Sequence, residues 1–180
     1  MKASNEFRPP MNQRIRALVQ LQRWSGLAVQ DACCFERAAL RRDADGNGFV
    51  KGRRAKTGVE VEIPIPADVA AELEALPNSN PKYFFWAGGG KKSTVAGRYS
   101  AAMKRLFEKA GVDPGDTVMK SHRLRDTFAA YYLGEKKFAL EAVAEMLGHN
   151  PTVTRKHYDH WVQGRQDALN KEVIASWAKK

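Results

Sequence analysis

Apolar positions recur at helical spacing along most of the chain. Residues 11–26 place Ile15, Leu18 and Val19 on one helical face, and Gly26 is suited to end that helix. The same kind of spacing, with its stop signals, predicts helices at 29–35, 67–76, 93–110, 121–133, 138–147, 151–158 and 164–177. The apolar run KYFFW at 82–86 predicts a short strand or a wedge in the core.

One stretch has a different period. In GFVKGRRAKTGVEVEIPIP, residues 48–66, Val59, Val61 and Ile63 alternate with charged neighbours, which is typical of a strand. Turn-forming residues lie before and inside this stretch, so it predicts a small antiparallel hairpin or a three-stranded sheet. The expected fold class is therefore mostly α with a small antiparallel β-sheet, an α+β fold.

The length of 180 residues fits one domain. Residues 1–10 are polar and contain Pro9-Pro10, which predicts a linker or arm before a domain spanning 11–180. The sequence has no apolar run long enough to cross a membrane and no secretory h-region. Cys33 and Cys34 are adjacent and cannot build a disulfide framework, so we interpret them as buried thiols of a cytosolic protein.

The chain carries a large excess of positive charge. The 30 Lys and Arg against 20 Asp and Glu give a net charge of +10. Such a balance favours a polyanionic partner, with nucleic acid first and an anionic membrane surface second. A merely basic protein without such a partner stays open, because charge alone indicates no chemistry.

Two loop motifs fail when their positions are checked. DADGNG begins like a calcium loop, but Arg54 stands where a bidentate Glu is required, so a turn between strands is expected. AGGGKKST lacks the glycine and the hydroxyl of a phosphate-binding loop, since Phe85 and Lys92 occupy those positions. It is better interpreted as a flexible loop whose Lys91 and Lys92 contact a phosphate backbone.

Three histidines fall within GHNPTVTRKHYDHW, residues 148–161. Zinc binding is one interpretation of His149, His157 and His160. Their spacing does not match a known ligand pair, and no thiolate or carboxylate is placed to complete a tetrahedron. No metal site is expected here.

Three segments together carry a stronger signal: SHRLRDTFAAYYL (121–133), MLGHNPTVTRKHY (146–158) and RRAKTGVEVEIPIP (53–66). They resemble the catalytic domain of tyrosine recombinases, the phage integrase family. That family has His-x-x-Arg on a helix, then Leu-Gly-His, then a nucleophilic tyrosine nine residues after that histidine, and a basic residue in a β-hairpin. The matching residues here are His122, Arg125, His149, Tyr158 and Lys56.

The resemblance implies the integrase catalytic-domain fold and DNA strand cleavage through a 3′-phosphotyrosine, with double-stranded DNA as partner and no metal or nucleotide cofactor. His122 and Arg125 lie three residues apart, hence on one helical face, and can reach one phosphate together. Arg125 would clamp phosphate oxygens, and His122 would donate to an oxygen or take the tyrosine proton. By resemblance, Lys56 is the general acid for the departing 5′-hydroxyl and His149 a further phosphate donor.

Basic residues near these motifs are the candidates for contacting the DNA backbone. They are Lys51, Arg53, Arg54, Lys91, Lys92, Arg123 and Arg155.

One family position is missing. The family carries a catalytic arginine in Thr/Ser-Gly-Leu-Arg-hydrophobic-x-Asp/Glu, whereas this chain reads SGLAVQD at 25–31, with Ala28 in place of the arginine. A transition-state arginine is worth ~10³–10⁵ in the rate of phosphoryl transfer, so the chain is expected to cleave DNA poorly. Either Ala28 is an engineered or isolated substitution, or the chain is a natural divergent member that is inactive or uses another arginine such as Arg23.

Two further expectations concern the ends of the chain. Family members usually carry a separate N-terminal DNA-binding domain, so this chain is expected to be an isolated catalytic domain. The C-terminal tail either packs on its own core or docks on a neighbouring protomer; its apolar residues at helical spacing are Ala168, Leu169, Val173, Ile174 and Trp177.

The expected function is a site-specific DNA recombinase in the cytoplasm, associated with the nucleoid and with no membrane partner. A type IB topoisomerase shares the chemistry, but the compact spacing from Leu-Gly-His to the tyrosine favours the recombinase. The alternative from another class is a non-catalytic DNA-binding module that keeps the fold.

Overall fold

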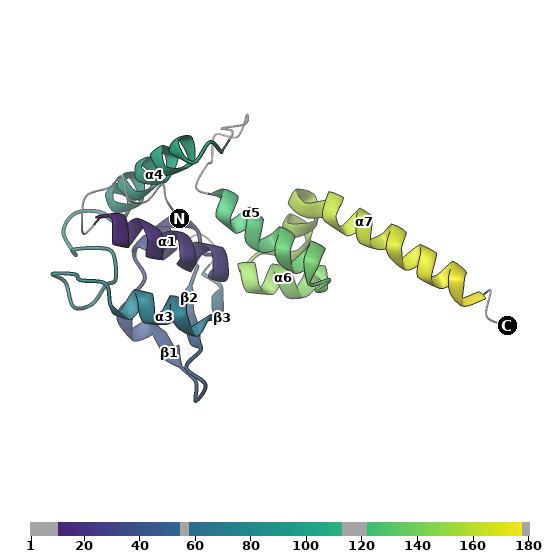
Figure 1. Cartoon of the computed structure of the whole chain (residues 1–180), viewed down its shortest axis with the longest axis horizontal. Coiled ribbons are helices and arrows are strands. Elements are labelled where there is room, and N and C mark those ends of the chain that lie inside the picture. The colour runs from purple at the N-terminus through teal and green to yellow at the C-terminus, as the bar shows by residue number, and fades with distance from the viewer. Residues whose placement is uncertain (1–10, 55–57, 113–121, 178–180) are drawn as a thin grey trace.

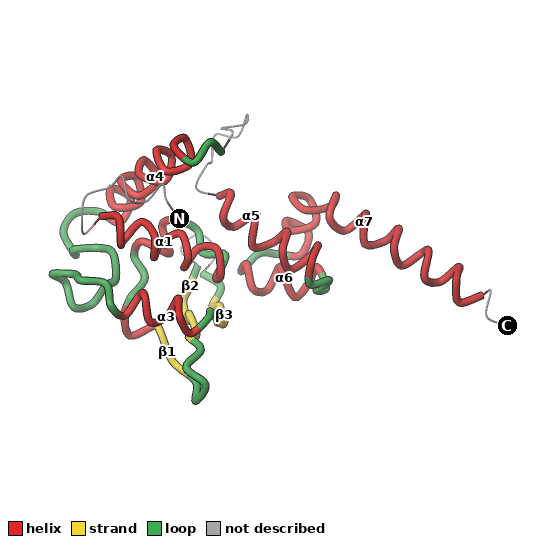
Figure 2. The backbone as a smooth tube through the Cα atoms, viewed as in Figure 1, coloured by secondary structure: helices red, strands yellow, loops and turns green. Residues whose placement is uncertain are grey.

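The computed structural model of the chain describes residues 11–54, 58–112 and 122–177, with the backbone alone for 159–169. The elements follow each other as predicted in kind, mostly helices around one early sheet (Figures 1 and 2). They are α1 (Met11–Ser25), α2 (Val29–Cys33), η2 (Arg37–Ala39), β1 (Leu40–Arg42), β2 (Gly48–Arg53), β3 (Glu60–Ile65), α3 (Ala67–Glu74), α4 (Lys92–Lys109), α5 (Arg123–Ala130), η4 (Tyr131–Glu135), α6 (Leu140–Leu147) and α7 (Pro151–Trp177).

The sheet has three antiparallel strands in the order β1-β2-β3, which confirms the α+β fold class. Val61, Ile63 and Ile65 of β3 are buried and alternate with exposed residues, as the period of two predicts. Val59, which the alternating pattern placed in the strand, directly precedes β3 and is 43% exposed. The DADGNG stretch forms the turn between β1 and β2, where the Asp43 carboxylate accepts the backbone N–H groups of Asp45 and Asn47.

The core consists of two clusters of buried side chains. The larger one is formed by α1, α2, β2, α3 and α4, with Phe84 and Phe85 of the KYFFW run wedged into it. The smaller one is formed by β3, α5, α6 and Tyr158. Fully burying each large apolar side chain contributes about 1.5–3 kcal/mol. The smaller cluster supports the ends of α5 and α6, where the catalytic candidates lie.

Cys33 is buried at the end of α2, and the Cys34 side chain is half-buried, with the two sulfur atoms 3.9 Å apart. The expectation of two buried thiols therefore holds for the first cysteine only. Across the described residues, every helix is too short or too polar to cross a bilayer.

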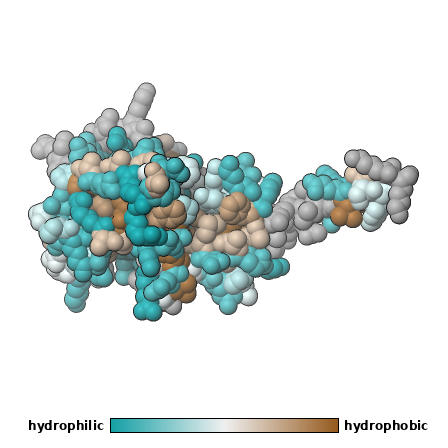
Figure 3. Space-filling view, turned by 90° about the horizontal axis from the view of Figure 1, so that it is seen from below, coloured by the Kyte–Doolittle hydropathy of each residue, from teal (hydrophilic) through white to brown (hydrophobic). Residues whose placement is uncertain are grey.

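Two helical predictions differ from the structure at their ends. The helix expected at 121–133 ends at Ala130 as α5 and continues as the π-helical turn η4. The helices expected at 151–158 and 164–177 form one element, α7, with a kink at Tyr158, whose φ of −124° and ψ of 16° are not helical. Beyond that kink α7 extends away from the body (Figure 1), and its described end carries an apolar patch (Figure 3).

Candidate active site

Arg125 ties together three segments that are distant in sequence. Its side chain leaves the first turn of α5, is only 4% exposed, and donates hydrogen bonds to the carbonyls of Gly26 and Leu147. Its Nη2 also lies 2.8 Å from Nε2 of His149. Burial lowers the pKa of the guanidinium, yet arginine remains charged near neutral pH. A fixed cation therefore lies where the ends of α1 and α6 meet.

His149 follows the end of α6 through a left-handed glycine. Gly148 has φ 63°, and the N–H groups of Gly148 and His149 donate to the carbonyls of Glu145 and Ala144, which closes the last helical turn. Burial, with Arg125 and Arg54 nearby, lowers the pKa of the His149 imidazole to about 4, so the ring is neutral at pH 7.

The neutral ring has one donor and one acceptor nitrogen. Because a guanidinium can only donate, Nε2 of His149 accepts from Arg125, and the ring proton is therefore on Nδ1. Nδ1 is buried and has no hydrogen-bond partner among the described residues. It can donate to a phosphate oxygen, as the resemblance implies for this residue.

Tyr158 lies at the kink of α7, packed in the smaller core cluster and 6% exposed. Its hydroxyl donates to Oδ1 of Asp126 over 2.7 Å. Burial and this hydrogen bond raise the pKa of the phenol above its ordinary value. The ring and Asp126 also line a cavity of about 660 Å³, together with Arg123 and His157.

Two of the other family positions, His122 and Ala28, lie near these residues. His122 is the half-buried residue before α5, and its charge acts on His149. Ala28 is the half-buried residue before α2, in extended conformation, two positions after the Gly26 carbonyl that binds Arg125. Its methyl group has no donor to offer there. Lys56 lies outside the described residues.

Arg54, grouped by sequence with the DNA-contacting surface, is 4% exposed. Its Nη2 donates to the Met146 carbonyl over 2.8 Å. Burial and the nearby Arg125 lower the pKa of its guanidinium to about 10, so it stays charged at pH 7. Arg54 therefore adds a second cation to the site.

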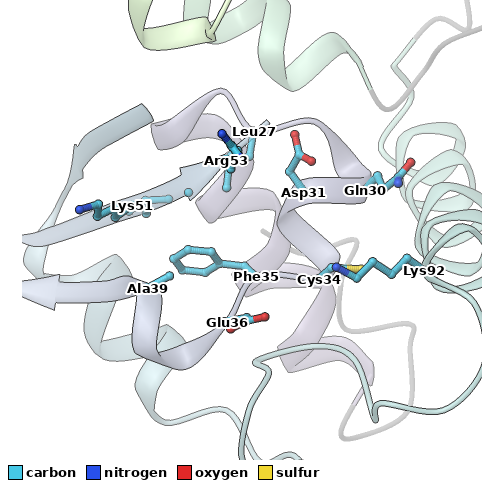
Figure 4. Close-up of a pocket in the computed structure, with 12 residues that line it drawn as sticks. Leu27, Gln30, Asp31, Cys34, Phe35, Glu36, Ala39, Lys51, Arg53 and Lys92 are labelled. Carbon is cyan, nitrogen blue, oxygen red and sulfur yellow. The ribbon is translucent and has the colours of Figure 1, made fainter. Parts of the chain in front are cut away.

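The remaining basic candidates are on the surface. Lys51, Arg53 and Lys92 are exposed and line a pocket of about 280 Å³ between α2, β2 and the start of α4, which also includes Asp31 (Figure 4). Lys91 is exposed next to Lys92. Arg155 is exposed on α7, 3.9 Å from the carboxylate of Glu141.

Sequence reasoning missed the partner of Tyr158 and the burial of Arg54. Asp126 directly follows Arg125, but nothing in the sequence indicates that α7 brings the tyrosine hydroxyl to it. Among the residues that the structure describes, no three His, Cys, Asp or Glu side chains gather where they could hold a metal ion.

The profile of the phage integrase family matches residues 1–164. No curated protein matches the chain significantly.

Solved structures resemble the chain over most of its length. The XerH site-specific recombinase bound to palindromic difH substrate superposes with a TM-score of 0.68 at 18% identity, over 93% of this chain and 49% of that one. The XerA recombinase gives 0.65 at 18% identity, over 93% and 60%. A lambda integrase (75–356) dimer bound to a COC′ core site gives 0.56 at 21% identity, over 79% and 50%. At these identities the likeness concerns the fold, and the chain spans about half to three-fifths of the lengths of these relatives.

Proposed function

The chain belongs to the phage integrase family, and on that premise we propose that it is a site-specific DNA recombinase. It would cut and rejoin DNA strands through a covalent 3′-phosphotyrosyl intermediate. The observation that carries the proposal is the convergence of Arg125, His149 and Tyr158 from the start of α5, the end of α6 and the kink of α7. A hydrogen bond joins Arg125 to His149, and the charge of Arg125 acts on Tyr158.

The proposed reaction is a transesterification. The Tyr158 oxygen attacks the phosphorus, the bond from phosphorus to the 5′-oxygen breaks, and the departing oxygen takes a proton. Arg125 and Nδ1 of His149 donate to the non-bridging oxygens, on which charge develops. We assign the proton of the leaving group to Lys56 and that of the tyrosine to His122. The bond energy is kept in the phosphotyrosine, so the reaction consumes no nucleotide.

Binding of DNA would use basic residues at the surface. Lys51, Arg53 and Lys92 line the pocket beside α2, and the exposed Lys91 and Arg155 and the half-buried Arg123 are further candidates. Contacts of this kind bind phosphate without reading sequence, and they weaken as salt rises. With DNA as substrate, we expect the protein at the nucleoid of the cytoplasm.

The proposal has two further parts, the effect of Ala28 and the role of the end of α7. Ala28 removes one phosphate donor, so the chain would cleave more slowly than one with arginine at this position. The described end of α7 exposes Val173, Ile174 and Trp177. Their exposed fractions are 49%, 58% and 68%, respectively. Because this face does not pack on its own core, we propose that it docks on a neighbouring copy on DNA.

Ala28 also favours the second candidate, a DNA-binding module that has lost the reaction. Formation of a covalent protein–DNA adduct distinguishes the recombinase from the binding module. The test uses nicked duplexes of randomised sequence, in which the short strand beyond the nick diffuses away and leaves the adduct trapped. On a denaturing gel, the Ala28→Arg chain is expected to form adduct and the Ala28→Arg/Tyr158→Phe chain none. Salt-sensitive binding by Ala28→Arg without any adduct would support the binding module.

A further inference from the structure

The side chain of Arg54 is buried, yet two of its nitrogens have no hydrogen-bond partner among the described residues. Its side chain is 4% exposed, and among the described residues only Nη2 of its three guanidinium nitrogens has a partner, the Met146 carbonyl. Nε and Nη1 are buried without a hydrogen-bond partner among the described residues. A buried donor without a partner is costly, and more so when it is charged. Two charged donors of Arg54 are therefore left without a partner among the described residues of the site.

Arg54 and Arg125, the arginine pair, lie side by side. They donate to consecutive carbonyls at the end of α6, those of Met146 and Leu147. Each is at most 4% exposed, and the charge of Arg125 acts directly on Arg54. Two like charges at this burial repel each other, and the carbonyls offset this only in part. An oxyanion between them would satisfy both guanidinium groups.

The arginine pair also adjoins the position of Ala28. The carbonyl of Gly26, two residues before Ala28, accepts from Arg125. Asp31, one helical turn after Ala28, acts electrostatically on both members of the pair. Arg54 directly follows the end of β2. Its neighbour Arg53 instead stays exposed and donates to the Gly58 carbonyl.

We propose that Arg54 is a direct ligand of the scissile phosphate and supplies the cationic donor that Ala28 lacks. This inference rests on the proposed recombinase function. Arg54 and Arg125 then hold the non-bridging oxygens together, and the residual cleavage by the chain depends on Arg54. Arg23, the substitute considered from sequence, instead lies over the ring of Trp24, 5.6 Å from its centroid.

The test is a cycle of adduct rates on the nicked duplexes. Arg54→Met keeps the volume and removes the donors, and it is measured in the native chain and in the Ala28→Arg chain. In the native chain we expect a rate loss of ~10²–10³, the cost of losing one transition-state donor. In the Ala28→Arg chain the loss should be under about tenfold, because the new arginine takes over the role. Equal losses in both chains, or none in the native chain, would overturn the inference.

Thermal denaturation distinguishes a structural role of Arg54 from a role in binding the phosphate. Arg37→Met is the matched control, because Arg37 is half-buried and donates to the Leu76 carbonyl in the larger core cluster. If Arg54 serves the phosphate, Arg54→Met leaves Tm unchanged or raises it, because a buried charge with unused donors is removed. A Tm drop larger than that of the control, with adduct lost in proportion, would assign Arg54 to the fold.

A second arm of the test needs no DNA cleavage. It tests oxyanion binding by Arg54 separately from the recombinase proposal. Inorganic sulfate, compared with chloride at equal ionic strength, should raise Tm more in the native and Arg37→Met proteins than in Arg54→Met, where only the general stabilising effect of sulfate remains. If even Ala28→Arg forms no adduct, the recombinase proposal fails, and this arm alone decides whether Arg54 binds an oxyanion. If Ala28→Arg forms adduct and the native chain forms none, the recombinase proposal stands and Arg54 does not compensate.

Discussion

The hydroxyl of Tyr158 donates a hydrogen bond to the carboxylate of Asp126 over 2.7 Å. The proposed nucleophile is thus held by the residue next to Arg125, and its proton is stabilised by burial and by a negative charge. For attack on phosphorus, the oxygen must leave this carboxylate or lose its proton. Asp126 therefore limits the availability of the tyrosine oxygen for attack.

Asp126→Asn should shift the reaction to lower pH. The amide keeps an acceptor for the hydroxyl but removes the charge that raises the phenol pKa. The pH profile of adduct formation, measured in the Ala28→Arg chain, is expected to move toward acid. Asp68→Asn, on α3 in the other half of the body, is the control and should leave the profile in place. A profile that is unchanged or moves toward alkali contradicts this role of Asp126.

His149 should make stability depend on pH. Its folded pKa of about 4 lies below the ordinary 6.5, so between these values the unfolded chain binds more protons. The contribution of this residue is complete above pH 6.5 and is lost as pH falls toward 4. His149→Gln keeps an acceptor for Arg125 but cannot titrate. The Tm difference between the two proteins should change across this window, and parallel Tm curves would refute the assignment.

Gly148→Ala should destabilise the fold and disturb the arginine pair. The residue has φ 63°, and a Cβ atom there would lie 2.7 Å from Cγ of Arg54. The left-handed conformation alone costs about 1–2 kcal/mol for a residue with Cβ. Gly97→Ala, inside α4 with nothing within 4 Å of its Cβ, should instead stabilise by about 0.5–1 kcal/mol. Urea unfolding measures both, and equal effects would argue against the close approach.

Replacing Val173, Ile174 and Trp177 with serine should leave the isolated chain as stable as before. These side chains are exposed at the end of α7, and such changes usually shift stability by less than about 0.5 kcal/mol. Assembly of several copies on DNA should weaken, as seen by sedimentation of the complexes. Met11→Ser, an exposed apolar residue on the body, serves as control. Unchanged assembly would remove the docking role of this face.

The sequence predicted what depends on local periodicity. The period of two gave the strands, and the spacing of apolar residues gave the helices around them, because both patterns follow from backbone geometry. The joint spacing of His122, Arg125, His149 and Tyr158 indicated a shared site because it is far more specific than any single motif. The helical break expected after residue 158 is present as a kink at Tyr158 itself.

What remained hidden depends on contacts between distant segments. Arg54 follows an exposed arginine in a run of basic residues, and no local pattern distinguishes the two. Its burial comes from packing against Gly148, which is far along the chain. The hydrogen bond between Tyr158 and Asp126 likewise requires α5 and α7 to meet. Lys56, outside the described residues, stays a prediction.

The attachment of Arg125 to the carbonyls of Gly26 and Leu147 makes the position of its side chain depend on the completed fold. Those carbonyls are correctly placed only when the ends of α1 and α6 have docked on each other. A chain that is still folding, or one whose α6 has frayed, cannot hold Arg125 in this position. Under the proposed function, cleavage of DNA would therefore require the completed fold.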